Sequence, residues 1–234
     1  MSMKLYSDAS KRAPRPRRVR IFIAEKFLQV EVVSMDLYKD NRTPEFRKKN
    51  PMGTLLVLEL DDGTCIAESM TIGRYLEALH REPCNLGASP LDVATIELWN
   101  RRSEFAFLMP IEFAGGFLGD DVTEGARRRV EKTMRLFDGE LASRRFIAGD
   151  KFPVADITTK VAIDLDVRFK EIIIPDDVTN FRRWHEETDS RPSANAWLRA
   201  AARWRPHERS PGSTDSRAFP SSLAFWYRDP AAWR

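Results

Sequence analysis

Residues 50–76 read NPMGTLLVLELDDGTCIAESMTIGRYL, and no other segment of the chain says as much about its architecture. A turn at 50–53 leads into a short apolar run, and an Asp-Asp-Gly turn at 61–63 separates this run from a brief strand at 64–67. A turn of this kind between two apolar runs indicates a β-hairpin. Apolar residues then recur at three- and four-residue spacing, which predicts an amphipathic helix: Ile72, Tyr75, Leu76 and Leu79.

An acidic residue and a serine, Glu68 and Ser69, stand where this predicted helix begins. The backbone N–H groups of a first helical turn have no partner within the helix, and the positive end of the helix dipole lies there. A carboxylate is therefore a favoured ligand at Ser69.

The order Asn-Pro, Gly, apolar run and Glu-Ser resembles the N-terminal domain of the glutathione transferase family. It appears here as Asn50, Pro51, Gly53, Leu55, Leu56, Val57, Leu58, Glu68 and Ser69, and the resemblance covers most of residues 3–200. It implies an α/β thioredoxin-like N-terminal domain followed by an all-α C-terminal bundle. A hairpin with a capped helix, taken alone, would also suit many other α/β domains.

The composition is that of an ordinary globular protein. The 234 residues leave room for two modest domains, and 42% of them are hydrophobic. No apolar run approaches the ~20 residues that a membrane span requires, and the N-terminus lacks the apolar core of a signal peptide, so a cytoplasmic protein is expected. The two cysteines, Cys65 and Cys84, form neither a disulfide framework nor a metal-ligand spacing.

The run at 11–20, KRAPRPRRVR, is strongly basic. Such runs can mark nucleic-acid binding or nuclear import. No aromatic residue interleaves this one, and the net charge of the chain is only +3, whereas most nucleic-acid binders are basic overall. A nucleic-acid partner is therefore not expected.

The N-terminal part alternates predicted strands and helices. The expected elements, besides the hairpin and its helix, are strands at 4–6 and 30–33 and a helix at 19–26. That helix is expected to start at or just after Pro16, and Thr43 is expected to cap a short helix that begins with Pro44. The resulting order, β-α-β-α-β-β-α, is thioredoxin-like, and this domain is assigned to 1–83.

The rest of the chain lacks strand signals apart from three isoleucines at 172–174. Helices are expected at 92–108, at 124–143, after Pro153, and at 182–203 with an interruption near Pro192. This pattern predicts an all-helical domain over 92–205, joined to the first by a linker at 84–91. The remaining residues, 206–234, form an atypical tail, for which a disordered end is favoured over an aromatic flap on the helical domain.

Residues 146–157, FIAGDKFPVADI, look like a second signature of the family, in which Ser or Thr caps a buried helix and an Asp three residues later bonds back. Pro153 takes the cap position here, and its side chain accepts no hydrogen bond, so half of the capping box is missing. Asp156 can still accept from upstream N–H groups. Its expected role is structural rather than catalytic.

The resemblance implies that the tripeptide glutathione is the co-substrate. Glu68 and Ser69 would hold its γ-glutamyl end, and the backbone of Leu55 would pair with its cysteinyl unit. Arg42 matches a basic position in the plant tau-class pattern Asn-Lys-Ser-Pro, which reads Asn-Arg-Thr-Pro at 41–44, and would face the glycyl carboxylate. Simple helix capping by Glu68 and Ser69, and a solvated loop charge at Arg42, are the alternatives.

The residue that activates the thiol is not at its usual position. Serine-type members of the family carry Ser-Pro-Phe-x-x-Arg-Val, whereas this chain reads Ala-Pro-Arg-Pro-Arg-Arg-Val at 13–19. Ala13 therefore stands where those members have the serine whose hydroxyl activates the glutathione thiol. A guanidinium near the helix N-terminus would favour a thiolate by charge and hydrogen bonding, which makes Arg15 the preferred catalytic candidate. Ser10 is a further candidate, and Ser7 and Tyr6 are other donors in the same loop.

Leu56 is a second departure, because the family almost always has a cis-proline there. A non-proline cis peptide bond costs ~3 kcal/mol, so we expect a trans bond between Leu55 and Leu56 and weaker glutathione binding than in a typical member. The acceptor pocket would lie between the domains. Its expected lining, most of which would fit a core equally well, is Trp99, Arg102, Phe105, Ala106 and Met109.

Two functions of different classes follow. The first is a glutathione transferase that conjugates glutathione to a small, hydrophobic electrophile, as in detoxification, and that needs no metal. A homodimer is expected by resemblance, and a membrane partner is not expected. The second is a transferase-like binding or interaction module with weak or no turnover, which Ala13, Leu56, Pro153 and the unusual tail favour. A glutathione-dependent reductase or lyase fits less well, because no cysteine lies in the active-site loop.

Overall fold

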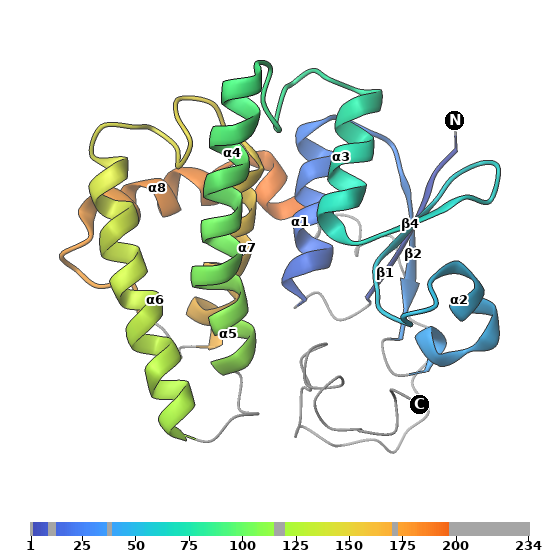
Figure 1. Ribbon diagram of the computed structural model, residues 1–234, viewed down its shortest axis with the longest axis horizontal. Coiled ribbons are helices and arrows are strands. Elements are labelled where there is room, and N and C mark those ends of the chain that lie inside the picture. Colours follow the sequence, from blue (N-terminus) through green and yellow to red (C-terminus); the bar gives the residue numbers. More distant parts are fainter. Residues whose placement is uncertain (1, 9–12, 37–38, 115–119, 170–172, 197–234) are drawn as a thin grey trace.

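The computed structural model describes residues 2–8, 13–36, 39–114, 120–169 and 173–196 (Figure 1). A small sheet and the helices that pack on it form the N-terminal half, and helices form the rest of the described chain. The thioredoxin-like domain and the helical domain are thus present, as the sequence predicts. The tail at 206–234 lies outside the described residues.

The described strands form one mixed sheet in the order β2-β1-β3-β4. They are β1 Lys4–Asp8, β2 Glu31–Met35, β3 Val57–Glu59 and β4 Cys65–Ala67. β1 runs parallel to β2 and antiparallel to β3, and β3 pairs antiparallel with β4. A tight turn suffices for the last pair, and Gly63 supplies the positive φ of 82° that this turn uses. The predicted hairpin is confirmed.

The helices of this half are α1 Pro14–Glu25, α2 Pro44–Lys49 and α3 Ser69–Leu79, with a 3-10 turn at Asp40–Arg42. The expected start of the first helix was wrong, because α1 begins at Pro14 rather than at or after Pro16. Both prolines fit, since a first helical turn needs no N–H group from them. Thr43 caps α2 as predicted, and its Oγ1 accepts from the N–H of Phe46 at 3.3 Å.

The helical half contains α4 Pro90–Ser103, α5 Met109–Ala114, α6 Asp120–Leu141, α7 Val154–Phe169 and α8 Thr179–Asp189, followed by a 3-10 turn at Pro192–Asn195. The last helix was expected at 182–203, but α8 starts earlier and ends at Asp189. None of the described residues in this half forms a strand. Ile173 and Ile174, which had a strand signal, lie in a loop.

The single helix expected over 92–108 is wrong, because a wider turn interrupts it. Glu104–Leu108 is π-helical, and the N–H of Met109 bonds to the carbonyl of Glu104, five residues back. Pro110 explains this turn: it has no N–H group, and in a regular helix its ring would clash with the carbonyl four residues earlier. The π turn accommodates the proline, and its first residue, Glu104, reaches α1.

Helix α1 lies between α3 of the first domain and α7 of the second (Figure 1). Its apolar residues Val19, Ile21 and Phe22 are buried in a core that continues through both domains. On the other face of the sheet, α2 covers a separate small cluster that includes Phe46 and Val57. The residues at the N-terminus of α1 therefore lie where the two domains meet.

Asp156 has the structural role that the sequence predicts. Its Oδ1 accepts from the N–H of Ile147 at 3.0 Å and from Nε1 of Trp184 at 2.6 Å, so it ties the loop before α7 to α8. Burial raises the pKa of Asp156 to about 7, although both hydrogen bonds act in the opposite direction. Pro153 contributes only its carbonyl, which accepts from the N–H of Asp156 at 3.1 Å.

Candidate active site

The N-cap residue of α3 does not cap the helix with its side chain. Glu68 stands at the N-cap with a φ of 68°, a left-handed conformation that is uncommon for a residue other than glycine and that is often found where a ligand binds. Its side chain is exposed and makes no capping hydrogen bond. The first N–H groups of α3 therefore gain no acceptor from the Glu68 side chain, and they are suited to bind an anion beside Ser69.

A buried arginine, Arg18, lies against Ser69. Its Nη2 donates to Oγ of Ser69, while its Nη1 donates to Glu104 at 2.7 Å and to Oγ1 of Thr158 at 3.2 Å. The residue is only 2% exposed, and burial lowers its pKa, partly offset by the carboxylate of Glu104. In the sequence, Arg18 matches the arginine of the family's Arg-Val pair, but it was not predicted to be a site residue. No local pattern indicates that its partners come from α3, the π turn and α7.

Arg15 occupies the first turn of α1, two residues after the N-cap Ala13, whose side chain makes no capping hydrogen bond. Its Nε and Nη2 donate to the two carboxylate oxygens of Glu112 in α5, at 3.2 and 3.0 Å. Burial is the largest single effect and lowers the pKa of Arg15, but the carboxylates of Glu112, Glu104 and Glu68 together outweigh it, so the pKa is raised. The charges of these three carboxylates therefore all act on Arg15, and the roles expected for Arg15 and Glu68 toward a ligand stay predictions.

The other thiol candidates lie elsewhere or cannot be described. Tyr6 donates its hydroxyl to Glu59 at 2.6 Å and packs against Phe46, on the α2 side of the sheet. The hydroxyl of Ser7 is buried and accepts from Nη2 of Arg20 at 2.9 Å. Ser10 lies outside the described residues.

The expected trans bond between Leu55 and Leu56 is wrong, because the structure has this peptide bond in cis. The expectation rested on the intrinsic preference of a non-proline residue, which takes no account of the tertiary surroundings. Leu56 is buried in the core, and β3 begins with the next residue, Val57. Weaker glutathione binding than in a typical member was expected from a trans bond, and it is no longer expected on that ground.

Arg42 is exposed and ends the 3-10 turn before α2. Its loop is fastened to the one that leads to Leu55, because Nδ2 of Asn41 donates to the carbonyl of Gly53 at 2.7 Å. Gly53 has a φ of 65°, and a Cβ there would lie only 3.3 Å from the carbonyl oxygen of Asn41, so glycine suits this close approach. The loops that carry Arg42 and Leu55 are therefore neighbours.

The described arginines of the basic run contact other side chains of the protein. Arg17 and Arg18 are buried, and Arg17 pairs with Asp164 at 2.6 Å. Arg15 is held by Glu112, and Arg20 by Ser7. These contacts join α1 to other parts of the molecule.

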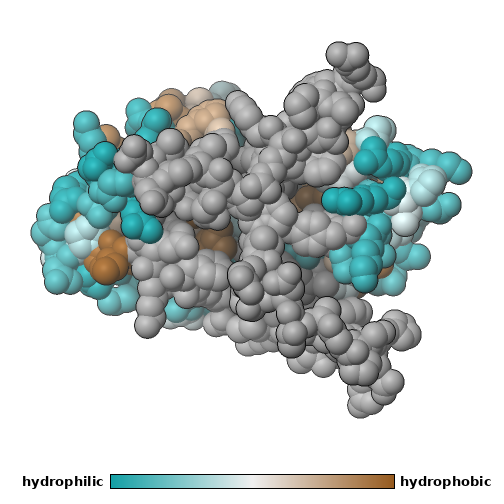
Figure 2. Space-filling view, turned by 90° about the horizontal axis from the view of Figure 1, so that it is seen from below, coloured by the Kyte–Doolittle hydropathy of each residue, from teal (hydrophilic) through white to brown (hydrophobic). Residues whose placement is uncertain are grey.

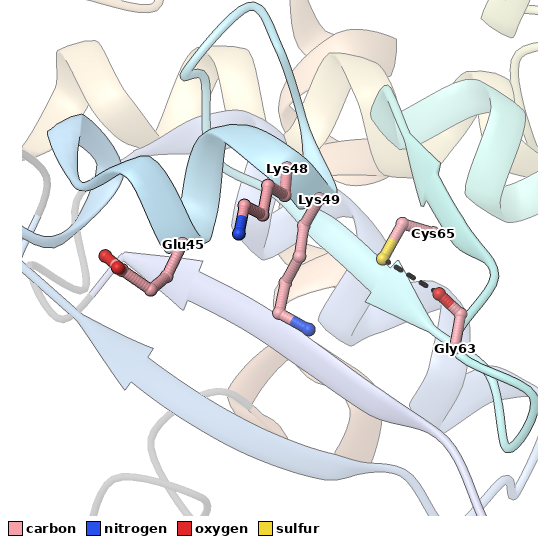
Figure 3. Close-up of a pocket in the computed structure, with 5 residues that line it drawn as sticks. All are labelled: Glu45, Lys48, Lys49, Gly63 and Cys65. Carbon is pink, nitrogen blue, oxygen red and sulfur yellow. Dashed lines mark hydrogen bonds between the residues drawn. The ribbon is translucent and has the colours of Figure 1, made fainter.

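A pocket on the α2 side of the sheet is lined by Glu45, Lys48, Lys49, Gly63 and Cys65 (Figure 3). Cys65 donates its thiol to the carbonyl of Gly63, at 3.5 Å, and burial raises the thiol pKa. A thiol with a raised pKa is a weak nucleophile, so this environment suits a cysteine that packs and does not react. The pocket lies on the α2 face of the sheet, whereas α3 packs on the opposite face.

Residues expected to line an acceptor pocket divide into two groups. Trp99 is buried and packs edge-on against Phe137, with ring centroids 5.1 Å apart, which is the core position that was the alternative to a place in the lining. Phe105 in the π turn is 54% exposed, and Arg102 lies over the Trp99 ring. On the face shown in Figure 2, the described hydrophobic residues lie in separate areas among hydrophilic ones.

No group of three or more His, Cys, Asp or Glu side chains that could hold a metal occurs in the part of the chain that the structure describes. Among the same residues, no helix has the length and apolar character needed to cross a membrane.

The donors at the α1 and α3 N-termini fit a small anionic peptide. Ser69 retains its hydroxyl proton for a ligand, because it accepts from Arg18 with an oxygen lone pair. Arg15 uses Nε and Nη2 for Glu112, and its side chain remains 28% exposed.

Comparison with known proteins gives the same family for both halves. Residues 1–78 match the model of the glutathione S-transferase N-terminal domain, and residues 105–192 match that of the C-terminal domain. Glutathione S-transferase 2 of Saccharomyces cerevisiae is 35% identical over 213 residues, which cover 85% of this chain and 91% of that protein. Elongation factor 1-gamma of Homo sapiens is 28% identical over 197 residues, or 78% of this chain, but the match spans only 44% of the factor.

Solved structures agree with these matches. Gtt2 from Saccharomyces cerevisiae superposes with a TM-score of 0.74 and 33% identity, over 83% of this chain and 100% of that one. A glutathione S-transferase domain-containing protein from Marinobacter aquaeolei gives a TM-score of 0.74 and 34% identity, over 81% and 98% of the two chains. The two family models, and a relative that is 35% identical along 85% of the sequence, show that this chain belongs to the glutathione S-transferase family.

Proposed function

We propose that this protein conjugates glutathione to a small, hydrophobic electrophile. The observation that carries the proposal is the contact of Arg18 with Ser69 at the N-terminus of α3, where the N-cap side chain makes no capping hydrogen bond. A hydroxyl that accepts from a guanidinium becomes a better donor, since linked hydrogen bonds polarise one another. Together with the first N–H groups of α3, it provides the donors that a carboxylate needs.

Each part of the tripeptide has a candidate partner. The γ-glutamyl carboxylate binds Ser69, and the exposed carboxylate of Glu68 attracts the α-amino group. The backbone of Leu55 pairs with the cysteinyl unit, and Arg42 attracts the glycyl carboxylate from the neighbouring loop. The stability of such an arrangement comes mainly from charge-assisted hydrogen bonds.

Arg15 is the proposed stabiliser of the thiolate. Its Nη1 has no hydrogen-bond partner among the described residues, while Nε and Nη2 are held by Glu112. A guanidinium favours the charged form of a nearby thiol and so lowers the thiol pKa. Arg15 thereby takes over the task of the hydroxyl that Ala13 lacks, and Ser10 remains a weaker candidate.

Calorimetric titration with glutathione tests the binding site, beside a rate assay with glutathione and a chlorinated aromatic acceptor. Ser69→Ala should weaken glutathione binding by about 10- to 100-fold, because a hydrogen bond to a charged group contributes ~1.5–3 kcal/mol. Ser143→Ala, at an exposed position after α6, should bind like the wild type. Unchanged binding by Ser69→Ala would refute the site, and a wild-type protein that binds no glutathione would refute the function.

The alternative is an interaction module with little or no turnover. The similarity to elongation factor 1-gamma and the missing hydroxyl at Ala13 favour it. The same rate assay separates the two functions. Glutathione binding without a rate above background for several acceptors would support the module.

We also propose a cytoplasmic homodimer that serves in detoxification and is divided into domains at 84–91. Large apolar residues exposed on α4, Leu91 and Leu98, are suited to contact a second copy. Sedimentation of the purified protein at several concentrations tests the dimer, and a monomer at all of them would contradict it.

A further inference from the structure

Arg15 owes its position to a residue of the other domain. Glu112 in α5 contacts it from 97 positions further along the chain, with one carboxylate oxygen on Nε and the other on Nη2. The carboxylate side chain is 6% exposed, whereas the arginine side chain is 28% exposed. The Glu112 side chain is thus held inside the protein, and the Arg15 side chain is partly accessible to solvent and to a ligand. This fork-shaped contact fixes a guanidinium more firmly than a single hydrogen bond.

We propose that Glu112 is a positioning residue that holds the Arg15 guanidinium at the N-terminus of α1 and offsets part of its positive charge there. This inference rests on the proposed function, because its measurable consequence concerns the thiol of bound glutathione. An arginine side chain loses rotamer entropy when it is fixed. Glu112 fixes Arg15 before a ligand binds, so binding does not incur that cost.

The charges around Arg15 come from four elements. Glu112 lies on α5, Glu104 on the π turn, Glu68 at the start of α3, and Arg18 on α1 itself. The cluster therefore contains more carboxylates than guanidinium groups. A lone guanidinium would lower the pKa of a nearby thiol strongly, but a carboxylate on the same guanidinium acts against it. Glu112 thus fixes the Arg15 guanidinium in place, and its negative charge also weakens the effect of that guanidinium on the thiol pKa.

The test is a pH titration of the ultraviolet thiolate absorbance of glutathione bound to four proteins: wild type, Glu112→Gln, Arg15→Gln and the double variant. Glu112→Gln keeps the shape of the side chain and one acceptor but loses the charge, so the thiol pKa should fall by about one unit. Arg15→Gln should raise it. When Arg15 is already replaced, Glu112→Gln should cause less than half of its wild-type shift, because only the direct charge effect of Glu112 on the thiol is left and the part that depends on its contact with the guanidinium is lost.

Further variants separate charge from folding. Glu112→Asp keeps the charge, and the thiol pKa should stay near the wild-type value; a fall as large as that in Glu112→Gln would overturn the role of the charge. Glu124→Gln, in an exposed ion pair with Arg128, is the matched control and should change nothing. Circular dichroism melting confirms that each variant is folded.

Two results would overturn the inference while the proposed function stands. One is a thiol pKa that does not change in Glu112→Gln, and the other is an equal shift with and without Arg15. A wild-type protein that binds no glutathione would overturn the proposed function and this inference together.

Discussion

At the scale of single residues, the buried carboxyl group of Asp156 makes the stability of the protein depend on pH. Its Oδ2 has no hydrogen-bond partner among the described residues, and burial raises its pKa to about 7, from ~3.9 in an unfolded chain. Between these values the folded protein binds more protons than the unfolded chain. The free energy of unfolding should therefore fall as the pH rises from about 4 to about 7, by up to about 1.4 kcal/mol per unit from this group.

Asp156→Asn should remove this contribution, because its amide oxygen can still accept from Ile147 and Trp184 and the side chain does not titrate. Urea unfolding at several pH values from about 4 to about 7 would measure the effect. We expect the free energy of unfolding of the variant to decline less with rising pH than that of the wild type. Parallel curves for the two proteins would contradict the prediction.

The sequence identifies residues whose role depends on their neighbours along the chain. Glu68 and Ser69 precede an amphipathic helix, and Asp156 follows a recognisable loop, so local patterns indicate all three. Glu104 and Glu112 meet Arg18 and Arg15 from 86 and 97 positions away, and no spacing rule predicts such pairs. The roles proposed for Glu68, Ser69 and Arg15 toward glutathione stay predictions.

At the scale of elements, α4 begins at a complete capping box. Oγ of Ser89 accepts from the N–H of Asp92, and the Asp92 carboxylate accepts from the N–H of Ser89, both at 3.1 Å. Ser89→Ala should lower the free energy of unfolding by ~1 kcal/mol. Ser143→Ala, whose hydroxyl makes only a long 3.4 Å bond after α6, should change it by less than about 0.5 kcal/mol in the same urea titrations. Equal effects of the two substitutions would argue against the cap.

The elements that the sequence predicts well carry a turn or cap signal at their ends. The hairpin at 61–63 and the Thr43 cap are examples. The start of α4 was placed too late, although Ser-Pro-Leu-Asp at 89–92 fits a capping box with proline in the first helical position. The π turn was not predicted, because the helix at 92–108 was inferred from apolar spacing alone. That spacing takes no account of Pro110, whose missing N–H group widens the helix.

At the scale of the whole molecule, charged residues of α1 join the two domains. Arg17 pairs with Asp164 of α7 at 2.6 Å, and Glu25 receives two hydrogen bonds from Arg191, at 3.0 and 2.7 Å. Burial raises the pKa of Asp164, but His185, Lys160 and Arg17 together hold it well below its usual range. The stability that this carboxylate contributes is therefore present above about pH 4 and is lost as the pH falls further.

Arg17→Met should destabilise the protein by ~3 kcal/mol or more at neutral pH, because it leaves the buried Asp164 carboxylate with fewer partners. The loss of stability below about pH 4 should also become shallower, since the pKa of Asp164 moves back toward its unfolded value. Arg128→Met removes an ion pair whose side chains are 68% and 53% exposed, and it should cost less than about 1 kcal/mol. Urea unfolding of both variants at neutral and acid pH measures the difference. If Arg17→Met were no more harmful than Arg128→Met, the buried pair would contribute nothing to the union of the two domains, and apolar packing between α1 and α7 would have to account for it alone.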